Sequence, residues 1–141
     1  MIRTLTIAAA LYASTLAAAE AADLTVAVTG VRNANGSVAA ALFNSEASFP
    51  KAGQAVAAFR VKAAQGSFQV TFHDLPPGRY ALTAYHDEND NGKLDTDVTG
   101  VPSEGYGVSN NARDELGPPQ FAKAAFDLGE AGKTVNVTIK Y

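Results

Sequence analysis

The chain has no cysteine and only two histidines among its 141 residues. Without cysteine it cannot form a disulfide, so it must fold without that kind of crosslink. Zinc and related metals prefer sites built from Cys and His ligands at characteristic spacings, and two histidines without such a spacing do not supply one. The sequence therefore excludes a disulfide scaffold and argues against a transition-metal centre.

Clusters of basic residues are also missing. The chain has 11 Lys and Arg against 14 Asp and Glu, which gives a net charge of −3 and a pI of about 5.2. Proteins that bind nucleic acid or anionic membranes need grouped Lys and Arg side chains to displace counterions from phosphates. We therefore expect neither nucleic acid nor an anionic lipid surface as a partner.

Long apolar runs are confined to the amino terminus. The apolar and small residues of 5–16 follow a basic residue and are too few to cross a bilayer as a helix. Together with the small residues that follow, they are typical of a secretory signal peptide cleaved after Ala19 or Ala21. We therefore expect residues 1–21 to be the signal and 22–141 to form one domain, without a membrane span, in the periplasm or outside the cell.

The mature part of the chain is patterned with a period of two. In the first such run Leu24, Val26 and Val28 alternate with polar or small residues, which is the pattern of a strand with one buried face. Short runs of this kind separated by Gly, Pro, Asn and Asp predict an all-β fold, a seven-stranded sandwich. The expected strands cover residues 24–29, 38–42, 56–62, 68–73, 80–84, 124–128 and 134–141.

Residues 87–120 form a stretch of about 34 residues without a periodic pattern, much longer than the usual connection between strands. Its Gly and Pro residues and Tyr106 distinguish it from a monotonous polar tract. We therefore expect one long but ordered loop.

The start of this loop has the spacing of a calcium site. A calcium loop supplies oxygens from positions 1, 3, 5 and 9 and a backbone carbonyl from position 7. These positions are filled by Asp87, Asn89, Asn91, Asp95 and, through its carbonyl, Lys93. The sequence therefore predicts that calcium is bound by these five residues.

Two features leave alternatives open. Position 12 is Val98, where an EF-hand has a bidentate glutamate, so further oxygens would have to come from Asp97, Glu104, a carbonyl or water. Second, Asn91-Gly92 is also a strong signal for a two-residue hairpin turn, in which case the acidic run would be an ordinary solvated turn.

Several motifs around this loop resemble a known family. Residues 72–80 read FHDLPPGRY, residues 85–95 read YHDENDNGKLD, residues 100–111 read GVPSEGYGVSNN, and residues 119–121 read PQF. In these motifs the chain resembles the secreted bacterial family of domain of unknown function 2141. The strand, Leu-Pro-Pro-Gly-Arg-Tyr turn and strand also resemble prealbumin-like and carboxypeptidase-regulatory-like sandwiches, which implies an immunoglobulin-like Greek-key fold. The family implies no activity, because it is uncharacterised.

The residues do not favour an enzyme. A hydrolase built on His86 would need a serine on a sharp turn, and neither Ser103 nor Ser109 lies in a Gly-x-Ser-x-Gly motif. A glycosidase could be imagined with Asp97 and Glu104 facing each other, but a small sandwich offers little cleft for a sugar. We therefore expect no catalytic residues and a non-enzymatic module of unknown biological role.

A binding module is the alternative. The loop 96–120 could present Tyr106, Asn110, Asn111 and Arg113 to a polysaccharide or an envelope protein, because loops on rigid sandwiches often carry recognition. The competing interpretation is that Tyr106 packs over the end of the sandwich and the asparagines satisfy turns.

Overall fold

The protein is described by a computed structural model that covers residues 20–114 and 117–141. Most of the predicted signal peptide, residues 1–19, lies outside the described residues. Within the described residues, no helix is both long and apolar enough to cross a membrane.

The described chain is almost entirely strand and loop, as the period-two pattern predicts. It contains eight strands, a short 3-10 helix η1 and one helical turn α1. In order these are β1 (Ala22–Val31), β2 (Ser37–Phe43), β3 (Ala57–Lys62), β4 (Gly66–Leu75), β5 (Gly78–Asp87), β6 (Tyr106–Val108), η1 (Ser109–Asn111), α1 (Phe121–Ala124), β7 (Phe126–Leu128) and β8 (Lys133–Thr138).

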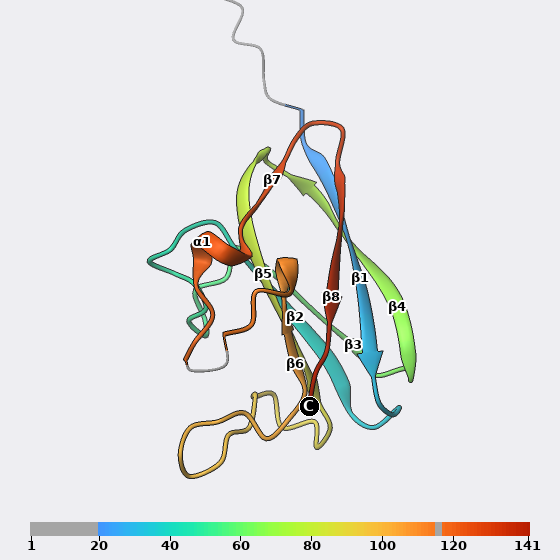
Figure 1. Ribbon diagram of the computed structural model, residues 1–141. Coiled ribbons are helices and arrows are strands. Elements are labelled where there is room, and N and C mark those ends of the chain that lie inside the picture. Colours follow the sequence, from blue (N-terminus) through green and yellow to red (C-terminus); the bar gives the residue numbers. More distant parts are fainter. Residues whose placement is uncertain (1–19, 115–116) are drawn as a thin grey trace, which may run out of the picture.

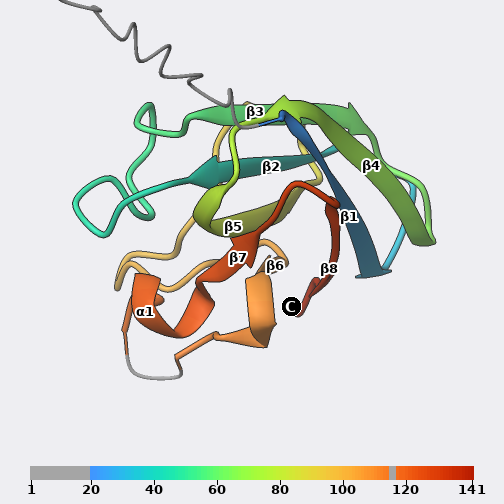
Figure 2. The ribbon, with the colours of Figure 1, turned by 90° about the horizontal axis from the view of Figure 1, so that it is seen from above.

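The strands form two sheets that face each other (Figures 1 and 2). One sheet has the order β4-β1-β8, with β1 antiparallel to β4 and parallel to β8. The other has the order β3-β2-β5-β6, and β7 also pairs with β5. After β8, Lys140 forms a bridge with Tyr106, so the end of the chain joins the second sheet. The fold is therefore all-β with two layers.

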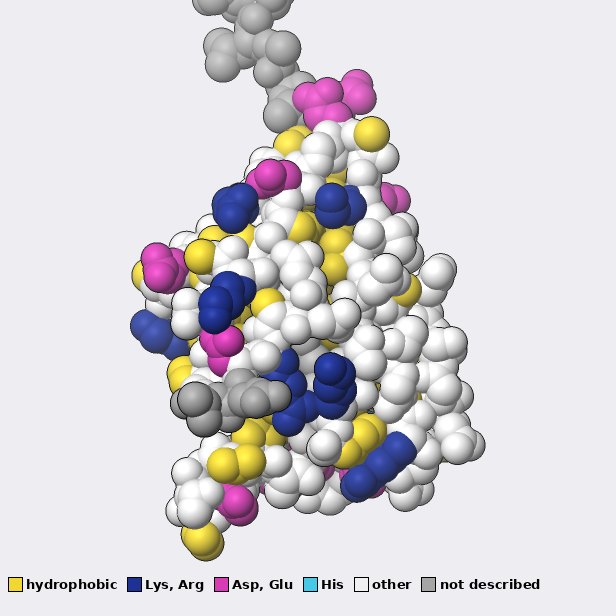
Figure 3. All heavy atoms as spheres, in the orientation of Figure 1, with side chains coloured by type: hydrophobic (Ala, Val, Ile, Leu, Met, Phe, Trp, Pro, Cys, Tyr) yellow, Lys and Arg dark blue, Asp and Glu magenta, His cyan; other side chains and the backbone are white. Residues whose placement is uncertain are grey.

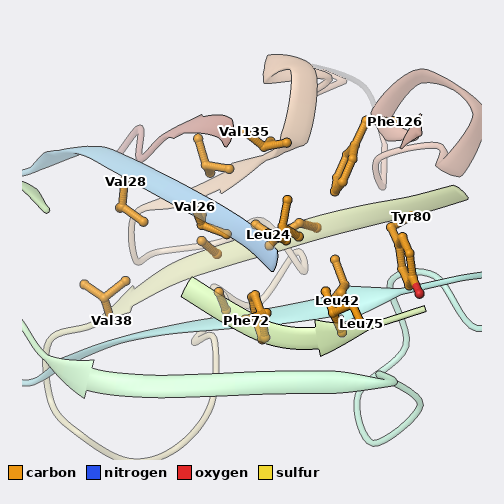
Figure 4. Close-up of a cluster of buried hydrophobic side chains, with 14 of the residues drawn as sticks. Leu24, Val26, Val28, Val38, Leu42, Phe72, Leu75, Tyr80, Phe126 and Val135 are labelled. Carbon is orange, nitrogen blue, oxygen red and sulfur yellow. The ribbon is translucent and has the colours of Figure 1, made fainter. Parts of the chain in front are cut away.

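The main core lies between the two sheets (Figure 4). Leu24, Val26 and Val28 of β1 are completely buried and pack with residues of β2 such as Val38 and Leu42. Because side chains alternate across a strand, these inward positions are the apolar half of the pattern visible in the sequence.

A second, smaller hydrophobic cluster lies on the outer face of the β2 and β5 sheet. Phe43, Phe49, Ala81, Val108 and Ala124 form it. The Phe49 ring meets the ring of Phe43 edge-on at a centroid distance of 5.4 Å and that of Phe121 at 5.8 Å. The connection between β2 and β3 and the turn α1 therefore cover this face, which the sequence did not predict.

Two sequence predictions about elements are corrected. The described residues form eight strands instead of the predicted seven, because Tyr106–Val108 pairs with β5 inside the stretch expected to be a loop. The strand predicted over 124–128 begins at Phe126, because Ala124 belongs to α1 and is buried in the second cluster. Apart from β6 and the short helix η1, the described residues 88–114 and 117–120 of this stretch form turns and loop.

Candidate metal centre

The predicted calcium loop follows the end of β5 at the lower end of the sandwich (Figure 1). Asp87 is the last residue of β5, and its backbone pairs with Ser37 at the start of β2. The loop therefore lies beside the connection between β1 and β2, and pairing with β2 fixes its first residue in place.

Asp87 differs from a typical exposed loop ligand because its side chain is completely buried. Its Oδ1 accepts the backbone N–H of Asn91 at 3.0 Å, and its Oδ2 accepts that of Gly92 at 2.7 Å. Oδ2 also accepts a hydrogen bond from Arg60 Nη1 at 2.9 Å. Burial raises the pKa of the Asp87 carboxyl, but the hydrogen bonds from Arg60, Gly92 and Asn91 outweigh burial and hold the pKa below its usual value.

Three other predicted ligands come together on the exposed side of the loop. The Asn89 amide donates to Asp95 Oδ2 at 2.7 Å, and the Asn91 amide donates to both Asp95 oxygens at 2.9 Å. The Oδ1 atoms of Asn89 and Asn91 accept the backbone N–H groups of Asn91 and Lys93. Positions 3, 5 and 9 therefore lie in mutual contact, while the side chain of Lys93 is exposed to water as predicted.

The two acidic residues considered as additional ligands have other roles. Glu104 is buried, and its two oxygens accept the backbone N–H groups of Glu88 and Asp95 at 3.0 Å. The Glu104 carboxylate therefore holds the two ends of the loop together. Asp97 Oδ1 accepts hydrogen bonds from Thr99 and Val101 and so folds the small hairpin that follows.

The hairpin between Thr96 and Pro102 projects from the lower end of the molecule, and Figure 3 shows hydrophobic atoms at the end of the corresponding loop. Val98, which stands at position 12 of the calcium pattern, is fully exposed there. Position 12 therefore contributes no side-chain contact to the loop.

The alternative of a two-residue hairpin turn at Asn91-Gly92 is wrong. Such a turn requires positive φ at both residues and a strand on each side. Here the residues with positive φ are Asp90 (57°) and Gly92 (83°), and the next strand begins only at Tyr106. The segment 88–95 instead curls around its own side-chain oxygens.

Sequence reasoning missed two residues that meet the loop from other strands. Arg60 of β3 contacts Asp90 Oδ1 at 3.1 Å in addition to Asp87, and Ser37 of β2 donates to the same Asp90 oxygen at 2.8 Å. A single arginine or serine in a strand carries no motif, so only the pairing of β3 with β2 and of β2 with β5 could reveal these contacts.

The donor set of the loop contains few charges. Among the described residues, no three His, Cys, Asp or Glu side chains are grouped closely enough to hold a metal ion. The contacts described above join two amides to one carboxylate, with Asp87 on the inner side of the loop. Calcium accepts amide, carboxylate and backbone oxygens, so its binding here would require the two amides to turn their oxygens toward the ion in place of the nitrogens that now face Asp95.

His86, the residue around which an enzyme was considered, is completely buried at the end of β5. Its Nε2 lies 2.7 Å from the carbonyl oxygen of Asn35, and its Nδ1 lies 2.6 Å from the hydroxyl of Tyr141. A carbonyl only accepts, so Nε2 donates to Asn35, while Nδ1 shares a hydrogen bond with the Tyr141 hydroxyl. His86 therefore attaches the end of β5 to the connection between β1 and β2 through Nε2 and to Tyr141 through Nδ1.

Most residues considered for a binding loop also make internal contacts. Tyr106 belongs to β6, and the guanidinium of Arg113 stacks on its ring at 4.0 Å. The Asn110 amide donates to the carbonyl oxygens of Lys123 and Ala125. Of the four residues, Asn111 is exposed at the end of η1, with a positive φ of 50°.

The lowered pKa of Asp87 predicts a pH dependence. An aspartate carboxyl has a pKa of about 3.9 in the unfolded chain, and the pKa of Asp87 is lower in the folded protein. The contribution of Asp87 to stability is therefore complete above the unfolded pKa and is lost as the pH falls through the folded pKa. We expect the free energy of unfolding, measured in urea with chelator present, to fall below about pH 4. The fall should be shallower for Asp87→Asn, and parallel curves for the two proteins would contradict this assignment.

Comparison with known proteins places the chain in a family. No curated protein and no solved structure matches it. The model of an uncharacterised protein family conserved in bacteria, domain of unknown function 2141, matches residues 26–136, which include most of both sheets and the whole candidate loop. The chain therefore belongs to this uncharacterised bacterial family, as the motifs around the loop predicted.

Proposed function

We propose that this protein is a non-enzymatic, exported β-sandwich module whose loop 87–95 binds calcium. The observation that carries the proposal is the convergence of Asn89, Asn91 and Asp95 on one point, with two amide groups in contact with one carboxylate. These are the residues at positions 3, 5 and 9 of the calcium pattern. Export is supported by the residue pattern of 1–21.

The free lone pairs of the loop support a cation. An amide oxygen has two acceptor sites, and the Oδ1 atoms of Asn89 and Asn91 each accept one backbone N–H. Each therefore retains an acceptor site for a metal. The Asp95 carboxylate has about four acceptor sites, and a cation there would replace the amide donors that it now accepts.

The arrangement also supports weak binding. Asp95 is the single carboxylate among ligand positions 3, 5 and 9, position 12 is an exposed valine, and Glu104 is engaged with backbone N–H groups. Calcium sites with few charged ligands have dissociation constants on the order of 10⁻⁴ to 10⁻³ M and occur in extracellular modules. Exported compartments can hold enough calcium to fill such sites.

We expect calcium to raise the melting temperature. At a free concentration about ten times the dissociation constant, binding adds about 1.4 kcal/mol to the free energy of unfolding, which corresponds to several degrees for a domain of this size. Magnesium should do less, because it demands a tight octahedron and gives up its waters reluctantly. Melting curves in calcium, in magnesium and in chelator, together with titration calorimetry, measure these effects.

Asp95→Asn is the informative variant, because it keeps the shape of the side chain and removes one charge. We expect it to abolish most of the calcium shift. Asp127→Asn is the matched control, since Asp127 lies on β7 at the opposite end of the sandwich and pairs only loosely with Arg79 at 3.5 Å. Equal melting temperatures of the native protein in calcium and in chelator, with no calorimetric signal, would refute the proposal.

We further propose that the fold belongs to the immunoglobulin-like, prealbumin-like Greek-key class. The strand order supports this assignment: β1 lies between β4 and β8, while β2 lies between β3 and β5. Successive strands therefore cross from one sheet to the other at β1 to β2, at β3 to β4, at β4 to β5 and at β7 to β8.

A further inference from the structure

Arg60 already places a positive charge on the candidate loop. It lies on β3 at the edge of its sheet, and its Nη1 contacts Asp87 Oδ2 at 2.9 Å and Asp90 Oδ1 at 3.1 Å. The same nitrogen donates to Ser37 Oγ, and Nη2 lies 3.4 Å from the Tyr85 hydroxyl. The guanidinium thus joins two acidic residues of the loop to two strands of the sheet.

The side chain of Arg60 also has access to water. About 38% of its surface is exposed, whereas the Asp87 side chain is completely buried. An open depression borders it, with Arg60 and Lys62 on one side and Glu88, Asn89 and Asp90 on the other. The guanidinium can therefore leave the loop for solvent without a change in the backbone.

We propose that Arg60 is the resident cation of the loop and that a divalent cation competes with it. The part of this inference that concerns competition rests on the proposed calcium function. Arg60 neutralises the buried Asp87 carboxylate and holds Asp90, so the loop is closed without a metal.

Two opposite effects follow from the position of this charge. A buried carboxylate without a counterion is costly, so Arg60 stabilises the metal-free protein. The same positive charge repels a divalent cation bound to the same loop, so Arg60 weakens calcium binding. If Arg60 had a purely structural role, its loss would lower both the stability of the metal-free protein and the affinity for calcium, because it would disturb both the fold and the site.

The test is Arg60→Gln, with Lys62→Gln as the matched control. Lys62 lies two residues further along the same strand, points to the same side and is exposed. Urea unfolding in chelator and calorimetric titration with calcium chloride are measured for both variants. We expect Arg60→Gln to unfold at a clearly lower urea concentration in chelator and yet bind calcium about tenfold more tightly than the native protein. Lys62→Gln should change affinity less than about twofold, because exposed charges are screened.

The outcomes separate this inference from the proposed function. If the native protein binds calcium and Arg60→Gln binds it equally or more weakly, the competition is refuted while calcium binding stands. If neither protein binds at about 10⁻² M calcium, ten times the weak end of the range, both proposals fail. Unchanged stability of Arg60→Gln in chelator would refute the role of Arg60 as resident cation.

A measurement on the native protein keeps the inference testable if Arg60→Gln does not fold. The side-chain N–H signals of Arg60 can be followed by nuclear magnetic resonance during a calcium titration. We expect protected, slowly exchanging signals in chelator that lose protection as calcium binds. Protection that persists at saturating calcium would refute displacement of the guanidinium.

Discussion

Gly36→Ala is expected to lower the free energy of unfolding by about 4 kcal/mol or more, which is a larger loss than most single substitutions cause. Gly36 has a φ of +63°, and a Cβ there would lie 1.9 Å from the carbonyl oxygen of Asp87 and 2.9 Å from the carbonyl group of Glu88. These neighbours are backbone atoms at the point where β5 enters the candidate loop, so they cannot rotate away. The connection between β1 and β2 or the start of the loop must therefore shift.

Gly53→Ala isolates the steric part of this effect. Gly53 has a similar φ of +78°, but a Cβ at this position would have nothing within 4 Å. Its substitution should cost only the left-handed backbone conformation, about 1 kcal/mol. Urea unfolding of both variants in chelator measures the difference, and equal losses would show that close approach at Gly36 has no role in stability.

Ser109→Ala is expected to cost about 3 kcal/mol, because it leaves two buried backbone groups without partners. The Ser109 hydroxyl is completely buried, accepts the backbone N–H of Leu82 at 3.0 Å and donates to the carbonyl oxygen of Ala124 at 2.6 Å. It thereby continues the pairing of β5 with β6 and attaches α1 to the sheet. Relative to the native protein, the substitution should also accelerate amide exchange more in α1 than in β1.

Ser67→Ala is the control for this prediction. Ser67 is exposed on β4, so its substitution should change the free energy of unfolding by no more than about 0.5 kcal/mol. Denaturant unfolding and hydrogen exchange of both variants provide the comparison. A loss below about 1 kcal/mol for Ser109→Ala would mean that water or a shifted backbone satisfies the two groups instead.

The stronger strands of the fold could be predicted from the sequence. Alternation over β1, β4 and β5 is long enough to indicate which face of each strand points into the main core, and the Pro-Pro-Gly turn between β4 and β5 marks their reversal. β6 could not be predicted in this way, since three residues carry no period. Its middle residue, Gly107, is determined by tertiary contact: a Cβ there would lie 2.3 Å from the carbonyl oxygen of Thr138.

The sequence alone determined the local chemistry of the candidate loop. Spacing placed oxygen-bearing side chains at alternate positions and a glycine with positive φ at the turn, because both properties depend on neighbours within nine residues. Tertiary structure alone decided which of these oxygens face water and which are already paired. Asp87 is buried where the end of β5 pairs with the start of β2, and Arg60 reaches it from 27 residues away because β3 and β5 both pair with β2. Contacts between segments that are distant in the chain depend on sheet order and register, and no short motif encodes these.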